Sequence, residues 1–327
     1  MQPKVSLLLT AYNFEAYIEA AVRSLLEQDF DEPFEVVVVD DCSPDRTAEV
    51  VAAIRDPRLR LIRNEVNLGA TESANRAFQF ARGKYIARLD GDDRWLPHFL
   101  KETVRALDEN PEVGLVYGDI HTLDAQDRVD ETSSIQRPDL PPKGFEFKAL
   151  LERYYICAPT ILARREAWND GLPFPERFKT GLGDWFVTLK IARKWPFLYI
   201  PKPLALYRVH SGGMHHHFIK DGTGERNMQA ILRYFLYETD GQELSAAEKH
   251  RLFALHYRTF GNGYMAMHMD RDARRCYWKA LRNHPAYLFD TGFLFPFFGS
   301  LIGQQSYNAL KSLIKNGKRT ARPLAQQ

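Results

Sequence analysis

The chain has 327 residues, of which 26% are charged, and its 44 Lys and Arg nearly balance its 42 Asp and Glu. This composition is that of a folded globular protein, and it excludes collagen-like, coiled-coil and disordered chains. A net charge of +2 provides no basic field for nucleic acid. Three cysteines, Cys42, Cys157 and Cys276, are too few and too far apart for a disulfide framework, so the sequence predicts a reducing compartment, the cytoplasm.

No segment has the roughly 18–20 uninterrupted apolar residues that a membrane-spanning helix needs. The nearest candidate, residues 286–302, is interrupted by Asp290 and Pro296. The N-terminal apolar run, residues 5–9, is too short for the core of a signal peptide. The sequence therefore predicts a protein that does not span a membrane.

The first 90 residues alternate strand and helix patterns. Strands are predicted at 4–10, 34–40, 59–63 and 85–89, and helices at 15–28, 47–54 and 71–81. The run FEVVVVD at 34–40 is apolar along its length, as in a parallel strand covered on both faces. This order predicts a doubly wound, Rossmann-like α/β sheet, whose ligands bind at the carboxyl ends of the strands.

The pattern then becomes mixed, and after residue 213 it becomes helical. Further strands are predicted at 113–118, 156–163 and 198–207, with helices near 145 and at 184–194. Later helices are predicted at 225–240, 245–261 and 264–284. The sequence therefore predicts an α/β domain over residues 1–215 and an appended helical region over residues 216–327.

Acidic residues follow the fourth predicted strand. Asp90, Asp92 and Asp93 lie within four residues, where carboxylates repel one another unless a cation lies among them. Hard oxygen ligands suit Mg²⁺ or Mn²⁺, and an acidic turn that caps the next helix is the alternative. The chain has no phosphate-binding loop of the P-loop type and no dinucleotide fingerprint, which argues against those enzyme classes.

Four spaced motifs together resemble the family 2 glycosyltransferases, which have the GT-A fold. They are T-A-Y-N at 10–13, V-V-D-D-C-S-P-D at 38–45, N-L-G at 67–69 and A-R-G-K-Y-I-A-R-L-D-G-D-D at 81–93. The resemblance covers about residues 4–213. It implies an inverting transfer of a sugar from a nucleotide diphosphate donor, most often a UDP-sugar, to a saccharide or lipid-linked hydroxyl, in polysaccharide or glycoconjugate synthesis.

The same resemblance implies a donor site at the strand ends. Its nucleotide-sugar-binding residues would be Thr10, Ala11, Tyr12, Asn13, Asp41, Asn67, Gly69, Arg76, Arg88, Asp90, Asp92 and Arg208. Tyr12 would stack on the base, and Asp41 would contact the base or the ribose. Many relatives carry Arg at the position of Ala74, where this chain has Asn75 and Arg76 next in sequence.

The resemblance also implies a Mn²⁺ or Mg²⁺ cofactor. Asp92 would be its first ligand, with Asp90 and with His210 of the segment Tyr207-Arg208-Val209-His210. Such an ion bridges the two donor phosphates and stabilises the charge of the leaving diphosphate.

An inverting transfer needs a carboxylate that takes the proton of the acceptor hydroxyl. Relatives usually carry Glu-Asp at the start of a late helix, and this chain has Gly183-Asp184. We expect Asp184 to be the base; the alternative is that it only caps the helix that follows.

The C-terminal segment from 291 to 327 contains no acidic residue. Its aromatic half precedes five cations, Lys311, Lys315, Lys318, Arg319 and Arg322. Aromatic residues followed by cations are typical of an interfacial anchor on an anionic membrane, which would place the protein peripherally on the cytoplasmic face. A helical core with a solvated tail is the other interpretation.

Two other functions remain open from the sequence. A sugar nucleotidyltransferase would share the sheet and the acidic site, but residues 11–15, AYNFE, are not its Gly-rich basic loop. A non-catalytic scaffold of the same fold is the second alternative, because Gly183 replaces the usual Glu.

Overall fold

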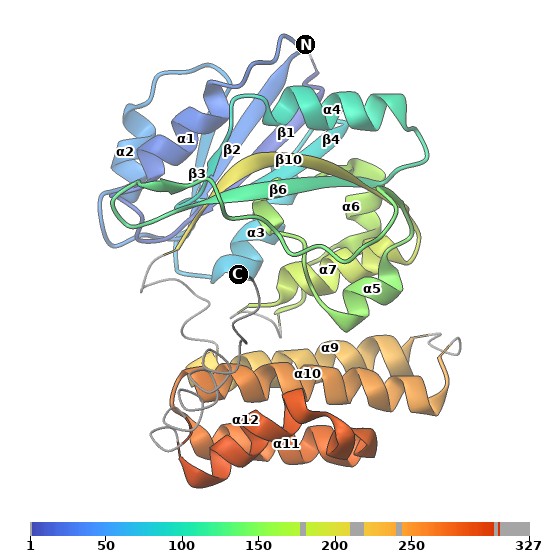
Figure 1. Cartoon of the computed structure of the whole chain (residues 1–327). Helices are drawn as coiled ribbons and strands as arrows, with labels where there is room; N and C mark the ends of the chain where they lie inside the picture. The colour runs from blue at the N-terminus through green and yellow to red at the C-terminus, as the bar shows by residue number, and fades with distance from the viewer. Residues whose placement is uncertain (1, 177–180, 210–218, 240–243, 304–306, 308–327) are drawn as a thin grey trace, which may run out of the picture. The chain divides into compact units, whose positions relative to one another are not determined.

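The computed structural model describes residues 2–176, 181–209, 219–239, 244–303 and 307. The chain divides into two compact units, Met1–Met214 and His215–Gln327. Figure 1 shows strands with helices in the first unit and helices in the second. The units are described one at a time.

The described part of the first unit is built on one ten-stranded sheet. Its main strand order is β3-β2-β1-β4-β9-β6-β10-β5, with β7 paired to β6 and β8 to β10. The strands are β1 Val5–Ala11, β2 Phe34–Asp40, β3 Leu59–Arg63, β4 Tyr85–Asp90, β5 Arg94–Trp95, β6 Leu115–Leu123, β7 Val129–Asp130, β8 Lys143–Gly144, β9 Leu162–Arg164 and β10 Phe197–Arg208.

Strands β1 to β4 run parallel, and their register aligns the residues that follow them. Thr10 pairs with Asp90, and Ala11 pairs with Asp40, so three strands end at the same edge. Strand β9 is antiparallel to both β4 and β6, whereas β10 runs parallel to β6. The mixed half of the sheet therefore begins directly beside β4, the strand that carries the acidic turn.

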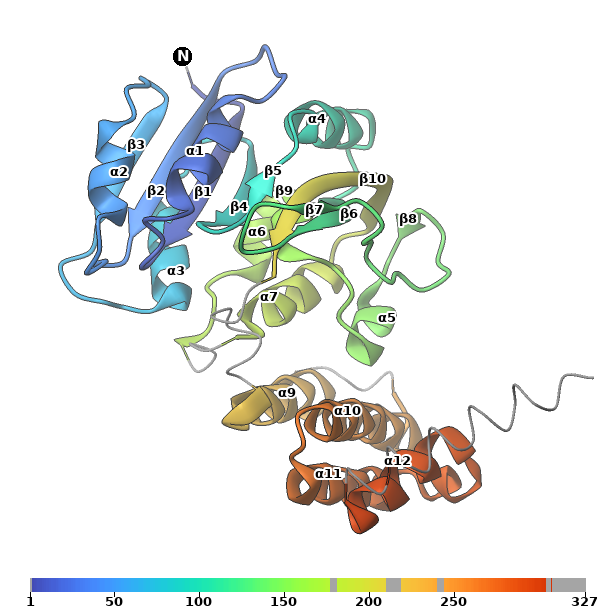
Figure 2. The same cartoon turned by 60° about the vertical axis from the view of Figure 1, so that its left-hand side comes forward.

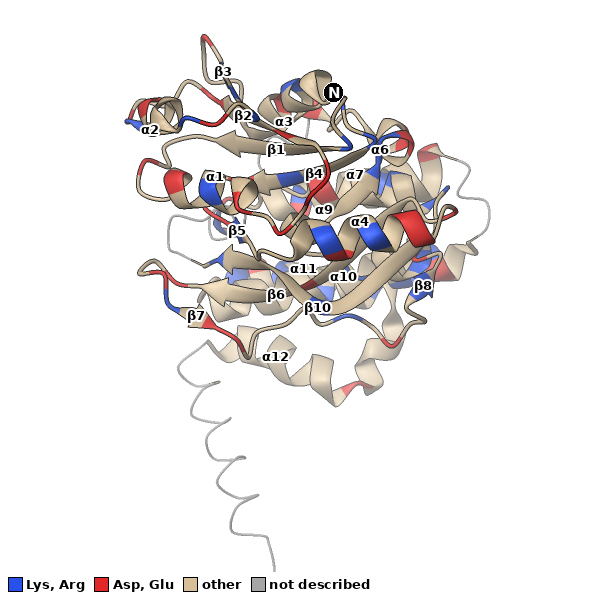
Figure 3. Cartoon of the chain, turned by 90° about the horizontal axis from the view of Figure 1, so that it is seen from above, with Lys and Arg blue, Asp and Glu red and all other residues tan. Residues whose placement is uncertain are grey.

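Helices cover both faces of this sheet. They are α1 Ile18–Leu26, α2 Thr47–Ala53, α3 Ala70–Phe80, α4 Phe99–Glu109, α5 Phe147–Glu152, α6 Arg165–Gly171 and α7 Gly183–Ala192. Helices α1, α2 and α4 lie on one face and α3, α6 and α7 on the other (Figures 1 and 3). Strands β1 and β2 are buried along their length, as the predicted run FEVVVVD requires.

The prediction of a strand at residues 156–163 is mostly wrong. Residues 156–163 form a 3₁₀ turn, Ala158–Thr160, followed by the three-residue strand β9. Pro159 lies in that turn, where its missing N–H and fixed φ favour a turn over a ladder. Its carbonyl accepts a hydrogen bond from Trp95 Nε1 at 2.6 Å, which fixes the turn beneath the sheet edge.

The second unit is helical over its described residues. Its elements are α9 Thr223–Arg233, the π-helical turn η3 Tyr234–Glu238, α10 Ala246–Ala266, α11 Asp270–Asn283, the 3₁₀ turn η5 Pro285–Phe289 and α12 Thr291–Ile302. Figure 2 shows α10 and α11 alongside each other, with α12 beside α11. Helix α10 begins with a capping box in which Ser245 and Glu248 satisfy each other's backbone N–H groups.

Two predictions for this unit need correction. The helix expected to end at 261 continues to Ala266, and the next begins at Asp270, not at 264. His268 adopts a left-handed conformation at φ 59°, so the chain reverses there without a glycine that would have marked the turn. Residues 291–302 form a helix despite Pro296. None of the helices within the described ranges is long and apolar enough to cross a membrane.

Candidate functional site

The ends of β1, β2 and β4 bring several predicted site residues together. Thr10 Oγ1 donates to Asp90 Oδ1 at 3.3 Å, which joins the ends of β1 and β4. The N–H of Asp41 donates to the carbonyl of Ala11 at 2.8 Å, which joins the end of β2 to the end of β1. The strand-end rule thus places Thr10, Ala11, Asp41 and Asp90 within one small region.

Tyr12 and Asn13 project from this edge. Asn13 has a left-handed backbone at φ 60°, and its N–H donates to Ser43 Oγ at 3.1 Å. That bend ends the strand and leaves the Tyr12 side chain 46% exposed. An exposed ring at a strand end has the geometry that stacking on a flat base needs.

Asp41 is 3% exposed and binds the protein itself. Its carboxylate accepts hydrogen bonds from the backbone N–H of Leu68 and of Gly69, each at 2.8 Å. A third bond comes from Asn64 Nδ2 at 2.7 Å. Asp41 therefore fixes the loop 64–69, in which Gly69 has φ 86°, a value that favours glycine. Asn67 is exposed on that loop.

Helix α3 carries two side chains with separate partners. Arg76 Nη1 donates to Asn64 Oδ1 at 2.9 Å, which adds Arg76 to the group that supports the loop. Asn75 forms two bonds with the backbone of Phe174: Nδ2 donates to its carbonyl at 2.9 Å, and Oδ1 accepts from its N–H at 2.8 Å. Asn75 therefore fixes Phe174, a site residue that the sequence did not indicate.

The acidic turn after β4 is closely packed. Arg88 Nη1 lies 2.6 Å from Asp90 Oδ1. A side chain at Gly91 would place its Cβ 2.8 Å from a ring carbon of Phe14, so a larger residue there would have to displace that ring. Asp93 is 2% exposed, and burial first, then the charges of Asp92 and Asp90, raise its pKa well above the ordinary value.

Arg208 links this turn to the rest of the sheet. Its guanidinium is fully buried: Nε donates to the carbonyl of Asp92 at 2.8 Å and Nη1 to that of Asp124 at 2.6 Å. Nη2 pairs with Asp127 Oδ1 at 2.6 Å, and the backbone N–H of Arg208 donates to Asp93 Oδ1 at 2.8 Å. The structure therefore gives Arg208 contacts that position the acidic turn.

The carboxylates of the acidic turn fit a divalent ion whose remaining coordination positions are filled by water and a bound ligand. Among the described residues, no group of three His, Cys, Asp or Glu side chains could hold a metal ion alone. Asp90 and Asp92 are half-buried hard-oxygen donors, and Asp93 is buried against the backbone of Arg208. Mg²⁺ and Mn²⁺ sites often use one or two carboxylates and complete the shell with water and phosphate oxygens. His210 lies outside the described residues.

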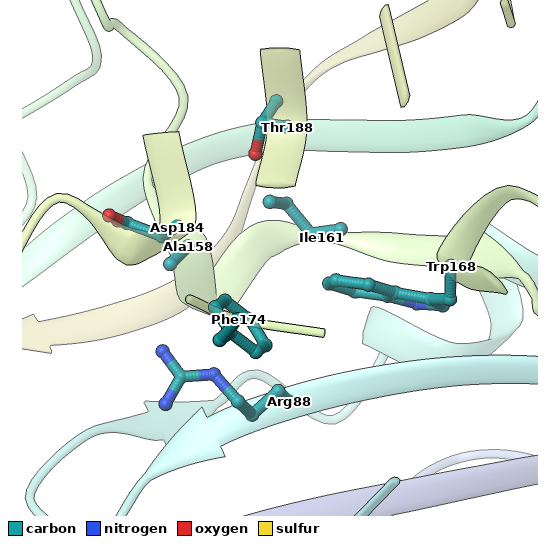
Figure 4. A pocket seen from close by; sticks show the side chains of 7 residues that line it. All are labelled: Arg88, Ala158, Ile161, Trp168, Phe174, Asp184 and Thr188. Atoms are coloured by element: carbon teal, nitrogen blue, oxygen red, sulfur yellow. The ribbon is translucent and has the colours of Figure 1, made fainter. Parts of the chain in front are cut away.

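A small pocket lies next to the acidic turn. Its lining residues are Arg88, Ala158, Ile161, Trp168, Phe174, Asp184 and Thr188. In Figure 4, Arg88 comes from β4 on one side, and Asp184 and Thr188 come from α7 on the other. Because Arg88 also holds Asp90, one guanidinium connects the pocket to the acidic turn.

Asp184 lies in the first turn of α7. The helix begins at Gly183 after Leu182, so Asp184 is not the capping residue that the alternative interpretation expected. Its Oδ1 accepts the N–H of Trp185 at 2.9 Å. Burial raises the pKa of Asp184, and the neighbouring Arg88 opposes this increase. A carboxylate with a raised pKa is a better proton acceptor near neutral pH.

The apolar walls of the pocket were not predicted. Trp168 and Phe174 come from α6 and the loop after it, and Thr188 comes from α7. These residues are far in sequence from the acidic turn, and nothing in their spacing marks them. Trp168 Nε1 donates to the carbonyl of Ile86 at 2.8 Å, which places the indole against β4.

Comparison with known proteins gives consistent similarities. Residues 6–171 match the family described as Glycosyl transferase family 2. The UDP-Glc:alpha-D-GlcNAc-diphosphoundecaprenol beta-1,3-glucosyltransferase WfgD of Escherichia coli is 30% identical over 186 residues, which cover 57% of this chain and 70% of WfgD. The succinoglycan biosynthesis protein ExoO of Rhizobium meliloti is 35% identical over 185 residues, 55% of this chain and 53% of ExoO.

A solved structure is similar across nearly the whole chain. TarS residues 1–349 of S. aureus, in complex with UDP-GlcNAc, align with a TM-score of 0.65 at 21% identity. The alignment covers 94% of this chain and 92% of that one. This likeness and the family match confirm the predicted α/β sheet of GT-A type with a helical C-terminal region.

Proposed function

The chain belongs to glycosyltransferase family 2 and is a glycosyltransferase, and from that premise we propose that it is an inverting, metal-dependent enzyme. It transfers a sugar from a nucleotide diphosphate donor to a saccharide or lipid-linked hydroxyl. Its relatives act in polysaccharide biosynthesis, and we assign this chain to polysaccharide or glycoconjugate synthesis. The observation that carries the proposal is the contact of Arg88 with both the acidic turn and the pocket of Asp184.

We propose UDP as the nucleotide of the donor. The names of WfgD and of the TarS complex specify UDP-glucose and UDP-GlcNAc for those proteins. In this chain, Tyr12 would stack on the base, while Thr10, Ala11 and Asn13 would line its pocket. Asp41 would act through the loop 64–69, since its carboxylate already binds that loop. Asn67 and Gly69 would then face the donor.

A divalent cation would be held by Asp92 and Asp90, with His210 as a third ligand. When bound, Mn²⁺ or Mg²⁺ stabilises the negative charge that develops on the leaving diphosphate. Arg88 orients Asp90, and Arg208 holds the backbone of the turn through Asp92. Arg76 supports the same site through Asn64 and the loop that Asp41 binds.

Asp184 would act as the general base. The acceptor hydroxyl oxygen forms a bond to the anomeric carbon as the bond from that carbon to the diphosphate oxygen breaks, and the hydroxyl proton passes to Asp184. Attack from the face opposite the leaving group inverts the anomeric centre. Trp168 and Phe174 are buried apolar walls of the pocket that Asp184 lines, and they exclude water from that side of the carboxylate.

The acceptor class remains a saccharide or lipid-linked hydroxyl, and we assign the reaction to the cytoplasm. All three cysteines of the chain are free in the structure, and Cys276 is buried, which supports a reducing compartment. WfgD, by its name, acts on a diphosphoundecaprenol-linked sugar, which supports a lipid-linked acceptor here. The net charge of +2 provides no basic field that would attract nucleic acid.

The Asp184→Asn variant tests the base. The amide keeps the size of the side chain but cannot take a proton, so we expect transfer to fall about 10²-fold or more. UDP and Mn²⁺ binding should remain, because the residues proposed to bind the donor and the metal are other residues. The measurement is sugar transfer under single-turnover conditions together with calorimetric titration of UDP.

Two results would contradict this assignment. Transfer at the normal rate in Asp184→Asn would reject the base. Absence of turnover with any nucleotide sugar in the unaltered protein, with partner binding retained, would favour the non-catalytic scaffold. Pyrophosphate release from a nucleoside triphosphate would instead identify a nucleotidyltransferase.

A further inference from the structure

The guanidinium of Arg88 lies against an aromatic ring. Its central carbon is 5.8 Å from the centre of the Phe174 ring, within the range of a cation–π contact. Figure 4 shows this ring beside the guanidinium, in the pocket that Asp184 also lines. Phe174 is 5% exposed, so the contact is shielded from water, which strengthens the attraction between cation and ring.

Two helices hold Phe174 in this place. Asn75 of α3 accepts from the N–H of Phe174 at 2.8 Å and donates to its carbonyl at 2.9 Å, as a neighbouring strand would. The Phe174 ring packs against Phe78 of α3 and Trp168 of α6, with centroid distances of 6.0 and 6.4 Å. The rings of Phe78 and Trp168 are 4.7 Å apart, so the three rings form one cluster. Both the backbone and the ring of Phe174 are therefore fixed.

The ring cluster is attached to the strand that carries Arg88. Trp168 Nε1 donates to the carbonyl of Ile86 in β4 at 2.8 Å. Ile86 and Arg88 are two residues apart on this strand, so their side chains lie on the same face of the sheet. The cluster therefore covers the face of β4 from which Arg88 projects.

On its other sides, Arg88 has charged neighbours. Nη1 lies 2.6 Å from Asp90 Oδ1, and Nη2 donates to Asp90 Oδ2 at 3.5 Å. Burial lowers the pKa of Arg88, but the charges of Asp90 and then Asp184 outweigh burial and raise it. An arginine side chain has many rotamers, so a fixed wall that restricts them reduces the entropy lost when the guanidinium is ordered between two carboxylates.

We propose that Asn75 and Phe174 are positioning residues of the transfer reaction, which together hold Arg88 between Asp90 and Asp184. This rests on the proposed function, in which Asp90 binds the metal ion and Asp184 takes the proton. Asn75 fixes the backbone of Phe174, the ring of Phe174 fixes Arg88, and Arg88 fixes the carboxylate of Asp90. Without the ring, Arg88 becomes mobile, and Asp90 loses its fixed orientation as a metal ligand.

The variant Phe174→Leu tests the ring. Leucine keeps the site apolar but removes the cation–π contact, so we expect Mn²⁺ binding in the presence of UDP to weaken by about threefold to tenfold. Calorimetric titration of Mn²⁺ into the protein with UDP measures this effect without turnover. The matched control is Phe253→Leu, which removes a buried ring from α10 in the helical unit and should leave Mn²⁺ binding unchanged.

A double-variant comparison shows whether Phe174 acts through Arg88. In an Arg88→Met background the guanidinium is absent, so the addition of Phe174→Leu should leave the Mn²⁺ affinity unchanged. An equal loss of affinity with and without Arg88 would overturn the proposal, because Phe174 would then act through general packing.

Asn75→Asp provides a second test, which also decides the matter if Phe174→Leu does not fold or Arg88→Met binds no Mn²⁺. Aspartate keeps the acceptor for the N–H of Phe174 but presents an oxygen, not a donor, to its carbonyl. We expect a loss of Mn²⁺ affinity similar to that of Phe174→Leu. Gln79→Glu adds the same charge at an exposed position of α3 and is the control. Equal affinities of Asn75→Asp and Gln79→Glu would overturn the role of Asn75.

The unaltered protein separates this proposal from the proposed function. If its UDP binding did not depend on Mn²⁺, the metal site itself would fail. If UDP binding depended on Mn²⁺ and Phe174→Leu bound the ion as tightly as the unaltered protein, only the positioning role would fail, and the metal site would stand.

Discussion

The charged groups of Asp41 and Arg208, which the family resemblance assigned to the donor, are occupied by the protein. Asp41 accepts bonds from the backbone of loop 64–69, and Arg208 donates to the carbonyls of Asp92 and Asp124. A sequence motif shows that a residue type recurs at a strand end, but not which neighbour it binds. Direct donor contact by these side chains therefore stays a prediction, while their positioning contacts are visible.

Arg208→Lys distinguishes positioning from phosphate binding. Lysine keeps the charge, but its single ammonium cannot span the carbonyls of Asp92 and Asp124 and the carboxylate of Asp127. Leaving buried acceptors unsatisfied costs about 1–3 kcal/mol, so we expect a measurably lower melting temperature together with weaker Mn²⁺-dependent UDP binding. Differential scanning calorimetry and UDP titration measure the two effects.

A purely phosphate-binding Arg208 would behave differently. In that case the lysine variant would lose donor affinity while its melting temperature stayed constant. Arg23→Lys is a suitable control, because Arg23 forms an exposed i,i+4 pair with Glu19 at 2.8 Å. Exposed pairs of this kind contribute little, so neither measurement should change.

At the scale of elements, segments with a strong hydrophobic pattern were predicted more accurately than the turns between them. The apolar run at 34–40 became β2 because continuous burial suits a central parallel strand. The strand predicted at 85–89, which contains the half-buried Arg88, became β4. The break predicted at 262–263 lies instead at 267–269, because His268 takes the left-handed turn without glycine. Helix α12 was missed because an all-apolar segment with an internal proline has no amphipathic period.

The helices of the second unit are joined by a buried ion-pair group. Glu225 of α9 is 3% exposed and pairs with Arg275 at 2.7 Å and with Lys279 at 2.9 Å, both on α11. Burial alone would raise the pKa of Glu225, but hydrogen bonds from Arg275 and then Lys279 outweigh burial and lower it to about 2. The group therefore makes the contact between α9 and α11 sensitive to acid.

The sign of this sensitivity follows from proton linkage. The folded pKa lies below the ordinary value of 4.5, so the stabilisation is complete above that value. It is lost as pH falls from about 4.5 to about 2, and the pKa difference corresponds to about 3 kcal/mol. We expect helical unfolding, followed by circular dichroism, to shift to lower temperature in this window.

Glu225→Gln should lower stability at pH 7 and remove most of this pH dependence. Removing one partner of a buried pair leaves the opposing charges uncompensated. Glu238→Gln, at an exposed position of η3, is the matched control and should retain the acid transition. An unchanged acid transition in Glu225→Gln would mean that other carboxyl groups control the unfolding.

At the scale of the whole molecule, the strand-end rule predicted which residues lie together at the sheet edge. Thr10, Asp41 and Asp90 lie at one edge of the sheet because parallel strands must end there together. The pocket walls could not be predicted, since Trp168 and Phe174 reach Arg88 only through the antiparallel strand β9 and the bonds of Asn75. Such contacts arise from tertiary packing, and no regular spacing of residues in the sequence indicates them.

The division into two units predicts how a ligand stabilises the chain. A ligand at about 100 times its dissociation constant adds about 2.7 kcal/mol to the state that binds it. The proposed donor residues that are described all lie in Met1–Met214, so UDP with Mn²⁺ should raise the transition of that unit. Glu225→Gln should lower the transition of the helical unit instead. Scanning calorimetry with both changes separates the two.

The combined experiment has a specific expected pattern. UDP and Mn²⁺ together should shift one transition upward in the unaltered protein and in Glu225→Gln by the same amount, because the effects of independent sites add. Mn²⁺ alone should give a smaller shift, since the carboxylates of the acidic turn complete their metal site only with diphosphate oxygens. If UDP raised the transition equally with and without Mn²⁺, the nucleotide would bind through protein groups alone, and the metal proposal for Asp90 and Asp92 would fail.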